Sequence, residues 1–178
     1  MMLNDRMTFP STLYNSRCTR HNRMNQHTIE ISHMIMDDID EIVFIENSSF
    51  PVPWSRDIFM RELHIPVSRS LIAKKHKNQD KEIAGYLIYW IIAGEVQIHK
   101  IAVKKEMRNS GIATKLIGEM VELSRQEGAC VCTLEVGQSN EIAKKLYEKC
   151  GFVITEVRKG YYRESGDDAL IMSADLKF

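Results

Sequence analysis

The sequence predicts an α+β or mixed α/β domain in which about four helices flank one sheet. Two observations predict this class. Short apolar runs recur along the chain and are typical of strands, and between them apolar residues spaced three and four positions apart are typical of amphipathic helices. The predicted order is strand, two helices, three strands, helix, strand, helix and two strands. A length of 178 residues is suited to a single domain.

The first 27 residues differ in composition from the rest of the chain. Arginines recur in this segment, Asp5 is its only acid, and it shows no helical or strand period. Its composition resembles a transit peptide, but it fits a flexible tail or an over-extended start equally well, with Met24 and Met34 as alternative starts. We expect residues 1–27 to be a flexible or mis-assigned N-terminal extension and residues 28–178 to form the domain.

The first half of the predicted domain opens with a strand at residues 28–34. Asp37 and Asp38 then begin a helix, prolines 51 and 53 interrupt it, and Ser55 is a good N-cap for a second helix. Strand-like runs follow at residues 70–73 and 83–92, separated by a polar turn at 74–81. A tight turn at 93–94 leads to a strand at 95–103, so these three strands are expected to form an antiparallel meander.

The second half begins with the clearest helix, residues 111–127, which Gly128 ends in the usual C-terminal manner. Its core-facing stripe has helical spacing and consists of Ala113, Leu116, Ile117, Met120, Val121 and Ser124. A buried strand is predicted at 131–136, a helix opened by Asn140 follows, and strands close the domain at 152–157 and 169–174.

Composition argues against several classes of protein. Lys plus Arg and Asp plus Glu both number 24, and basic residues neither cluster nor interleave with aromatics, so nucleic-acid binding is not expected. No apolar run approaches the roughly 18 residues of a membrane span. The four cysteines lack zinc-site spacing and are expected to be buried free thiols in a reducing cytoplasm. No metal site is predicted.

The segment from Ile101 to Ala113 is the most informative part of the sequence. A strand that turns through a glycine into a helix N-terminus presents free backbone N–H groups at the positive end of the helix dipole, where an anion is favoured. Gly111 lets the backbone approach phosphates, and Arg108 can add a charge-assisted contact. A helix start with a glycine for close packing explains the same pattern about equally well.

Glu135 is a lone carboxylate in an otherwise apolar strand, and it is a reasonable general base for an amine that must lose a proton. An edge position with the carboxylate in water or paired with a lysine is the alternative. Tyr147 lies one turn beyond Ala143 on the next helix. A tyrosine on an apolar stripe is more often a core residue with a satisfied hydroxyl.

These motifs resemble the GNAT acetyltransferase family. Arg-x-x-Gly-x-Ala after an Ile-Ala-Val strand resembles the family's acetyl-CoA pyrophosphate loop. The resemblance implies a mostly antiparallel sheet with a V-shaped strand split and acetyl-CoA as co-substrate. It also implies backbone contacts to pantetheine and diphosphate along this loop, from Ile101, Ala102, Val103, Arg108, Asn109, Ser110, Gly111, Ile112 and Ala113.

Leu-Glu-Val-x-x-Ser-Asn followed by Leu-Tyr-Glu-x-x-Gly-Phe resembles the RimI-like ribosomal-protein N-terminal alanine acetyltransferases within that family. The resemblance implies that Glu135 is the base, directly or through water, that Tyr147 protonates the departing thiolate, and that Asn140 binds near the pantetheine. It further implies a peptide acceptor, the N-terminal amine of a small-subunit ribosomal protein. The implied substrate-binding residues lie in a Pro-Trp loop and a late tyrosine pair, Phe50, Pro53, Trp54, Tyr161 and Tyr162.

Two positions depart from the RimI-like pattern: Gly137 stands where arginine is frequent, and Lys100 stands where asparagine is common. Either can alter which acceptor is bound. The alternatives are acetylation of a small amine or a lysine side chain, and a non-catalytic acetyl-CoA-binding module. The retention of both Glu135 and Tyr147 disfavours the last of these.

Overall fold

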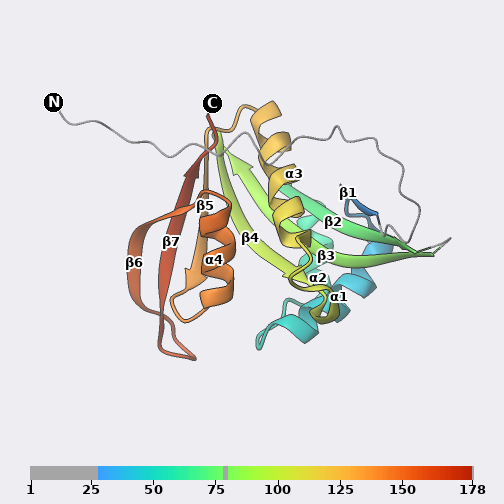
Figure 1. The fold of residues 1–178 in the computed structure, drawn as a ribbon, viewed down its shortest axis with the longest axis horizontal. Helices are drawn as coiled ribbons and strands as arrows, with labels where there is room; N and C mark the ends of the chain where they lie inside the picture. The colour runs from blue at the N-terminus through green and yellow to red at the C-terminus, as the bar shows by residue number, and fades with distance from the viewer. Residues whose placement is uncertain (1–27, 78–79, 178) are drawn as a thin grey trace. The chain divides into compact units, whose positions relative to one another are not determined.

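The computed structural model describes residues 28–77 and 80–177. Its strands form one seven-stranded sheet in the order β1-β2-β3-β4-β5-β7-β6 (Figure 1). The helices are α1 (Ile39–Ser49), α2 (Arg56–Glu62), α3 (Ile112–Gln126) and α4 (Glu141–Lys149). The strands are β1 (Ile29–His33), β2 (Ser68–Lys77), β3 (Asp80–Ile92), β4 (Glu95–Val103), β5 (Val131–Gly137), β6 (Val153–Tyr162) and β7 (Asp167–Asp175). The element order is the predicted one, and the mixed α/β class is confirmed.

The sheet is mostly antiparallel, as predicted. β1 pairs with β2, β5 with β7 and β6 with β7 in antiparallel registers, while β4 and β5 run parallel. The connections from β2 to β3 and from β3 to β4 are too short for a parallel crossover, so these neighbours are antiparallel as well. The pairing of β4 with β5 stops at Ile98 and Leu134 although both strands continue, which confirms the predicted strand split.

Contacts divide the described chain into two units. The N-terminal unit contains residues 28–77, 80–88 and 100–120, and the C-terminal unit contains residues 89–99 and 121–177. Strands β3 and β4 and helix α3 each contribute residues to both units.

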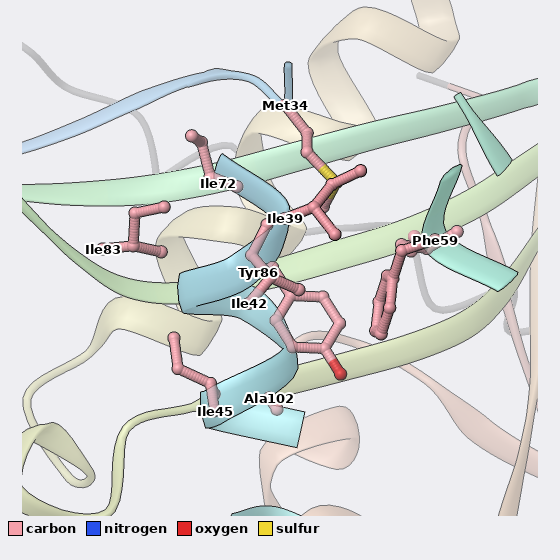
Figure 2. Close-up of a cluster of buried hydrophobic side chains, with 10 residues drawn as sticks. Met34, Ile39, Ile42, Ile45, Phe59, Ile72, Ile83, Tyr86 and Ala102 are labelled. Atoms are coloured by element: carbon pink, nitrogen blue, oxygen red, sulfur yellow. The ribbon is translucent and has the colours of Figure 1, made fainter. Parts of the chain in front are cut away.

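The core of the N-terminal unit lies between helix α1 and the sheet (Figure 2). Ile39, Ile42 and Ile45 follow the helical spacing, and all three side chains are fully buried. They pack with Phe59 of α2 and Tyr86 of β3, whose rings meet edge to face with centroids 5.5 Å apart. Full burial of each large apolar side chain contributes about 1.5–3 kcal/mol, so the predicted stripe fixes α1 on the sheet.

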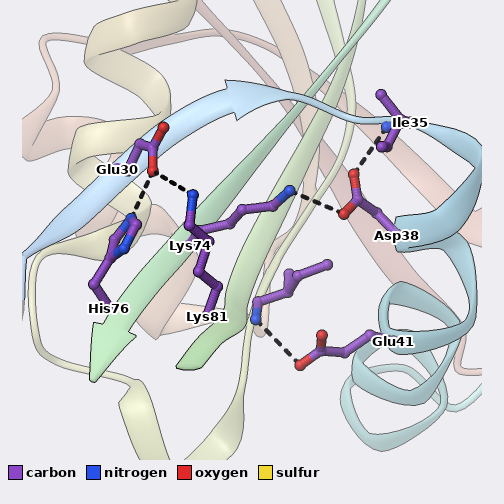
Figure 3. Close-up of polar contacts among 8 residues, drawn as sticks. Glu30, Ile35, Asp38, Glu41, Lys74, His76 and Lys81 are labelled. Atoms are coloured by element: carbon purple, nitrogen blue, oxygen red, sulfur yellow. Dashed lines mark hydrogen bonds and ion pairs between the residues drawn. The ribbon is translucent and has the colours of Figure 1, made fainter. Parts of the chain in front are cut away.

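Polar contacts fix the start of this helix (Figure 3). Oδ2 of Asp38 accepts a hydrogen bond of 2.9 Å from the Ile35 N–H, and Oδ1 lies 3.1 Å from the Lys74 ammonium of β2. The two predicted acids therefore do open the helical segment, through the short 3₁₀ turn Met36–Asp38. Ser55 occupies the N-cap position of α2 as predicted, but its hydroxyl makes no capping bond.

Helix α3 and the C-terminal elements match the predicted pattern closely. Gly128 has a φ of +83° immediately after α3, as the predicted C-terminal stop requires. The stripe residues Leu116, Ile117, Met120, Val121 and Ser124 are buried, and Ala113 is half-buried.

Three predicted boundaries are wrong. Residues 74–77 belong to β2 and residues 80–81 to β3, so most of the predicted polar turn at 74–81 is strand, and residues 78–79 lie outside the described part. Cross-strand charge pairs explain the longer strands, because Glu30 of β1 lies 2.6 Å from His76 and 3.7 Å from Lys81 (Figure 3). Strand β6 runs on to Tyr162, so the tyrosine pair lies in a strand rather than in the predicted loop.

No helix of the described residues has both the length and the apolar character that a membrane crossing needs. The predicted extension at residues 1–27 lies outside the described residues.

Candidate active site

The predicted phosphate cradle follows strand β4 in the N-terminal unit. After Val103 the chain makes a 3₁₀ turn (Lys105–Met107) and begins α3 at Ile112. Asn109 and Gly111 both have positive φ values, +60° and +80°. These turns leave the N–H groups of Asn109, Ser110 and Gly111 without an acceptor among the described residues. The first-turn N–H groups of α3 add to them, so several donors face the start of one helix.

Gly111 is not required by protein packing. A Cβ on this residue would meet no atom within 4 Å, so the space beside it is open. Its positive φ is the first reason for glycine, and close approach of a ligand to the backbone is the second. The side chain of Arg108 is exposed; it donates to the carbonyl oxygen of Val103 at 3.1 Å and to the hydroxyl of Ser49 at 3.2 Å. Both are neutral acceptors, so the guanidinium keeps its charge for an anion.

Strand β4 also offers free backbone edges. The N–H of Lys104 donates to Ala84 of β3 at 2.8 Å, and because peptide groups alternate along a strand, those of Ala102 also face β3. The peptide groups of Ile101 and Val103 therefore point to the other side, where no pairing with β5 extends beyond Ile98. Of the three predicted pantetheine contacts, Ile101 and the N–H of Val103 have the open orientation, whereas the Val103 carbonyl accepts from Arg108 and Ala102 is turned toward β3.

The predicted acceptor loop is anchored by a buried ion pair. Glu46 of α1 is completely buried; its Oε1 lies 3.0 Å from the Lys100 ammonium and accepts a hydrogen bond of 2.8 Å from the Trp54 N–H. The hydroxyl of Tyr86 donates to Oε2. The Lys100 ammonium also lies 3.8 Å from the centroid of the Phe50 ring and 5.3 Å from that of Trp54.

This cluster satisfies a carboxylate that would otherwise be costly to bury. Burial, and then the hydrogen bond and charge of Glu46, raise the pKa of Tyr86, so its phenol stays protonated. From the sequence, Lys100 was only a departure from the RimI-like pattern. In the structure it anchors the Phe50–Trp54 loop through its ion pair with Glu46. Pro53 of the same loop is exposed, and Trp54 packs against Phe59 with ring centroids 5.6 Å apart.

Glu135 lies on β5 in the C-terminal unit and is partly exposed, with 29% of its side chain accessible. Its Oε1 is 2.6 Å from Nη1 of Arg158 on β6. Tyr161 lies close to this carboxylate, and its interaction with Glu135 is the main reason that the pKa of Tyr161 is raised. The carboxylate is therefore neither free in water nor paired with a lysine, as the alternative interpretation supposed.

Glu135 and Tyr147 lie on different elements, Glu135 on the half-buried face of β5 and Tyr147 on helix α4. Along this strand Cys132, Leu134 and Val136 are buried, while Glu135 and its odd-numbered neighbours are half-buried, as alternation requires. Tyr147 is buried on α4, and the nearby thiols of Cys132 and Cys150 add to its raised pKa. Burial is the largest cause of that rise, and the tyrosine ring is only 5% exposed.

The Tyr147 ring contacts Phe152, with centroids 5.7 Å apart. Its hydroxyl has no hydrogen-bond partner within residues 28–77 and 80–177. The usual core tyrosine has a satisfied hydroxyl, so this one is a donor without an internal acceptor. A raised pKa keeps the proton on that oxygen.

Asn140 is the N-cap of α4, because its Oδ1 accepts a hydrogen bond of 3.1 Å from the Ala143 N–H. This leaves the amide nitrogen as the group that can serve the predicted contact with pantetheine. Beside it, Asp167 accepts hydrogen bonds from the N–H and hydroxyl of Ser139, at 3.2 Å and 2.7 Å, and these bonds lower the pKa of Asp167.

The structure gives a reason for glycine at position 137 that the sequence did not reveal. A Cβ at this position would stand 2.7 Å from Oδ2 of Asp167 and 3.7 Å from the Tyr162 ring. The Asp167 carboxylate therefore occupies the space into which a side chain at position 137 would project.

Tyr161 and Tyr162 lie at an irregular end of β6, where the register with β7 shifts between Arg158 and Tyr162. Asp168 holds this bulge: it accepts a hydrogen bond of 2.8 Å from the Gly160 N–H and lies 2.6 Å from the Lys159 ammonium. The two tyrosine rings meet edge to face with centroids 5.3 Å apart. The bulge thus turns Tyr161 toward Glu135.

The three described cysteines are free thiols; Cys132 and Cys150 are buried, as predicted, whereas Cys130 is half-buried. Burial raises the pKa of Cys132, and it raises that of Cys150 to about 11, so neither is a reactive thiolate at neutral pH. The remaining Cys18 lies outside the described residues. Within the described ranges, no three His, Cys, Asp or Glu side chains are grouped so that they could hold a metal ion.

The predicted residues thus form two sets. The cofactor loop and the Phe50–Trp54 loop belong to the N-terminal unit, and Glu135, Asn140, Tyr147, Tyr161 and Tyr162 belong to the C-terminal unit. Sequence reasoning gave no role to Glu46, Arg158 or Asp167. Arg158 has a signal in hindsight, since it follows Glu156 by two residues in a strand that carries alternating charges.

Comparison with known proteins identifies the same family as the sequence motifs. The model of the acetyltransferase (GNAT) family matches residues 39–152. A Bacillus subtilis protein provisionally named a ribosomal protein bS18-alanine N-acetyltransferase is 39% identical over 143 residues, which cover 80% of this chain and 92% of that protein. A Haemophilus ducreyi protein named a ribosomal protein bS18-alanine N-acetyltransferase is 30% identical over 149 residues, covering 82% and 99%.

Among solved structures, that of the ribosomal-protein-S18-alanine N-acetyltransferase of Escherichia coli superposes with a TM-score of 0.75. It is 24% identical in sequence, and the match covers 85% of this chain and 96% of that one. At this sequence identity the structural match is evidence for the fold alone.

Proposed function

Because the chain belongs to the GNAT acetyltransferase family, we propose that it transfers an acetyl group from acetyl-CoA to the N-terminal α-amine of a protein. The names of its relatives support a ribosomal protein with an N-terminal alanine as the acceptor, as in the bS18-alanine N-acetyltransferases. We place the catalytic domain at residues 28–178 and the reaction in the cytoplasm, where ribosomes reside, with neither nucleic acid nor membrane as a partner.

The proposed holder of acetyl-CoA is the segment from Ile101 to Ala113. Unpaired N–H groups at 109–111, the open space beside Gly111 and the exposed Arg108 suit a diphosphate. The outward peptide groups of Ile101 and the outward N–H of Val103 suit an amide-containing arm, and the amide nitrogen of Asn140 is proposed to add a contact. Bound there, acetyl-CoA supplies the thioester whose C–S bond breaks as the new C–N bond forms.

Glu135 is proposed to accept the proton that the acceptor's α-ammonium must lose, directly or through water. An α-amine has a pKa of about 7.7–8.0, so a nearby carboxylate needs only to capture one proton to release the nucleophile. That proton passes on to solvent. Phe50, Pro53, Trp54, Tyr161 and Tyr162 are proposed to line the acceptor's path.

Tyr147 is proposed to serve the leaving group. Its hydroxyl keeps its proton and has no acceptor among the described residues, so it can donate to the departing sulfur. The second proton of the amine balances the reaction, since the sulfur takes one from Tyr147 and the phenol recovers one from the nitrogen. Positioning the two reactants supplies much of the acceleration.

The observation that carries this proposal is the contrast between the accessible carboxylate of Glu135 on β5 and the buried phenol of Tyr147 on α4. An accessible base suits an amine that arrives with a proton to lose, and a phenol without an acceptor among the described residues suits a thiolate that needs a proton. A hydrolase or a covalent cysteine mechanism would instead need a nucleophile beside its base.

The test is consumption of acetyl-CoA by the purified protein with short peptides that begin with a free alanine. The matched peptides have the same sequence with a blocked N-terminus and one internal lysine. Turnover of the free N-termini alone supports the proposal. Turnover of the lysine peptide or of free polyamines would favour the small-amine or lysine alternative, and acetyl-CoA binding without any turnover would favour a binding module.

A further inference from the structure

The carboxylate that is proposed to act as base already has a cation bound to it. Nη1 of Arg158 lies 2.6 Å from Oε1 of Glu135, and Nε of the same guanidinium lies 3.3 Å from Glu156. The hydrogen bond to Glu156 raises the pKa of Arg158, and the charge of Glu135 adds to the rise, so the guanidinium is always charged. An acceptor's α-ammonium must therefore compete with it for Glu135.

Arg158 reaches Glu135 across an intervening strand. Glu135 is the register partner of Ile171 on β7, and Ile171 is the partner of Glu156 on β6, so all three side chains share one face. In the next row Gly137, Ala169 and Arg158 are partners. Ala169, the direct register partner of Arg158, has only a methyl side chain, so it leaves room for the long arginine side chain to lie over β7.

The pair is exposed enough to exchange. The side chains of Arg158 and Glu135 are 44% and 29% accessible, and Glu156 is 57% accessible. Ion pairs at such exposure contribute little net free energy, because water competes for both partners. Glu156 can hold the guanidinium when Glu135 releases it, so the exchange leaves no charge unpaired.

We propose that Arg158 is a positioning residue that orients the Glu135 carboxylate and yields it to the α-ammonium of the acceptor. The inference rests on the proposed function, in which Glu135 receives a proton from that amine. One cation replaces another on the carboxylate, so binding is selective for acceptors that carry a positive N-terminus. Arg158 then remains on Glu156 while the proton moves.

The chain offers a matched control beside this residue. Lys159 has the same charge and belongs to the same strand, but it lies 2.6 Å from Asp168 and its side chain is 79% exposed. Lys159→Gln therefore changes the net charge as Arg158→Gln does, without changing the contacts of Glu135. Arg158→Lys keeps the charge and tests whether a cation alone is sufficient.

The experiment measures the dissociation constants of a short alanine-initiated peptide and of its N-acetylated form, by calorimetry in the presence of saturating CoA. For Arg158→Gln we expect the free-amine peptide to bind about two- to five-fold more tightly, as loss of an exposed competing ion pair implies. The acetylated peptide should bind as it does to the wild type. The turnover number should fall, because the carboxylate loses its orientation. Lys159→Gln should leave both constants unchanged, and Arg158→Lys should restore wild-type values in part.

Weaker binding of the free-amine peptide to Arg158→Gln, an equal change for both peptides, or no change would overturn the inference. A merely structural role would move both peptides together. Failure of the proposed function looks different, because the wild-type protein would then acetylate no free N-terminus. Turnover by the wild type is therefore measured first.

Discussion

The chain contains two glutamates that are each paired with one cation and with one tyrosine, and they differ in burial. Glu46 is fully buried, and Lys100, Tyr86 and the Trp54 N–H saturate its two oxygens. Glu135 is 29% exposed, and its partners Arg158 and Tyr161 come from an exposed edge strand.

The difference in burial separates structure from chemistry. Charges that are hidden from water cannot exchange partners without a large cost, so the Glu46 cluster holds the loop in one place. Charges that water reaches can exchange partners cheaply, so the Glu135 cluster can receive a substrate. The same two residue types therefore support a rigid anchor in one unit and a reactive group in the other.

The largest expected effect is on stability at the buried cluster. Glu46→Ala leaves the Lys100 ammonium, only 13% exposed, without its counter-charge, and should lower the free energy of unfolding by about 3–5 kcal/mol. Urea denaturation measures it. As a control, Asp40→Ala removes an acid that is 82% exposed and paired with Arg56, and should cost about 0–1 kcal/mol. Equal effects of the two substitutions would remove the distinction between the clusters.

Glu135→Gln should act on the reaction and spare the fold. We expect kcat to fall about 10²–10⁴-fold, the usual contribution of a general base, with unchanged acetyl-CoA affinity and melting temperature. Steady-state kinetics and calorimetry measure these quantities. As a control, Glu164→Gln changes an exposed carboxylate that the proposed mechanism does not use, and should leave kcat close to the wild-type value. A loss of acetyl-CoA binding in Glu135→Gln would mean that its role is structural.

The two buried tyrosines extend the comparison. Tyr147→Phe should lower kcat about 10- to 150-fold, since a hydrogen bond to a charged group contributes about 1.5–3 kcal/mol, and should leave stability unchanged because the hydroxyl has no partner among the described residues. Tyr86→Phe removes a donor from buried Glu46, and should lower the free energy of unfolding by about 1–3 kcal/mol without a direct effect on kcat. Kinetics and thermal melts of both variants measure these effects. A loss of stability in Tyr147→Phe, or a loss of kcat without a loss of stability in Tyr86→Phe, would contradict the assignment.

The smallest effect is expected at the start of α4. Asn140→Ala removes the bond from the Ala143 N–H to Oδ1, and should cost about 0.5–2 kcal/mol of stability. If the amide nitrogen also contacts pantetheine, acetyl-CoA affinity should fall in Asn140→Ala. Asn140→Asp should then restore stability but not acetyl-CoA affinity, because aspartate can cap the helix but cannot donate a hydrogen bond. Equal acetyl-CoA affinity in all three proteins would limit Asn140 to capping.

Periodicity and turn chemistry were sufficient to predict most of the secondary structure. The stripe of α3, its stop at Gly128 and the cap of α4 by Asn140 are local patterns, and each was confirmed. The ends of β2 and β3 were mispredicted because their polar residues read as a turn. Cross-strand partners on β1 stabilise those residues as strands, and such partners cannot be seen along one segment.

The sequence by itself determined the fold class, the strand–loop–helix cradle around Gly111 and the candidate pair Glu135 and Tyr147, because these depend on local spacing and on a lone charge in an apolar strand. Only the tertiary structure decided that Glu135 meets Arg158 across β7, that Lys100 pairs with buried Glu46, and that Asp167 fills the space beside Gly137. Each of these contacts joins residues of different elements. The physical reason is that sheet register and burial, not separation along the chain, determine which charges meet.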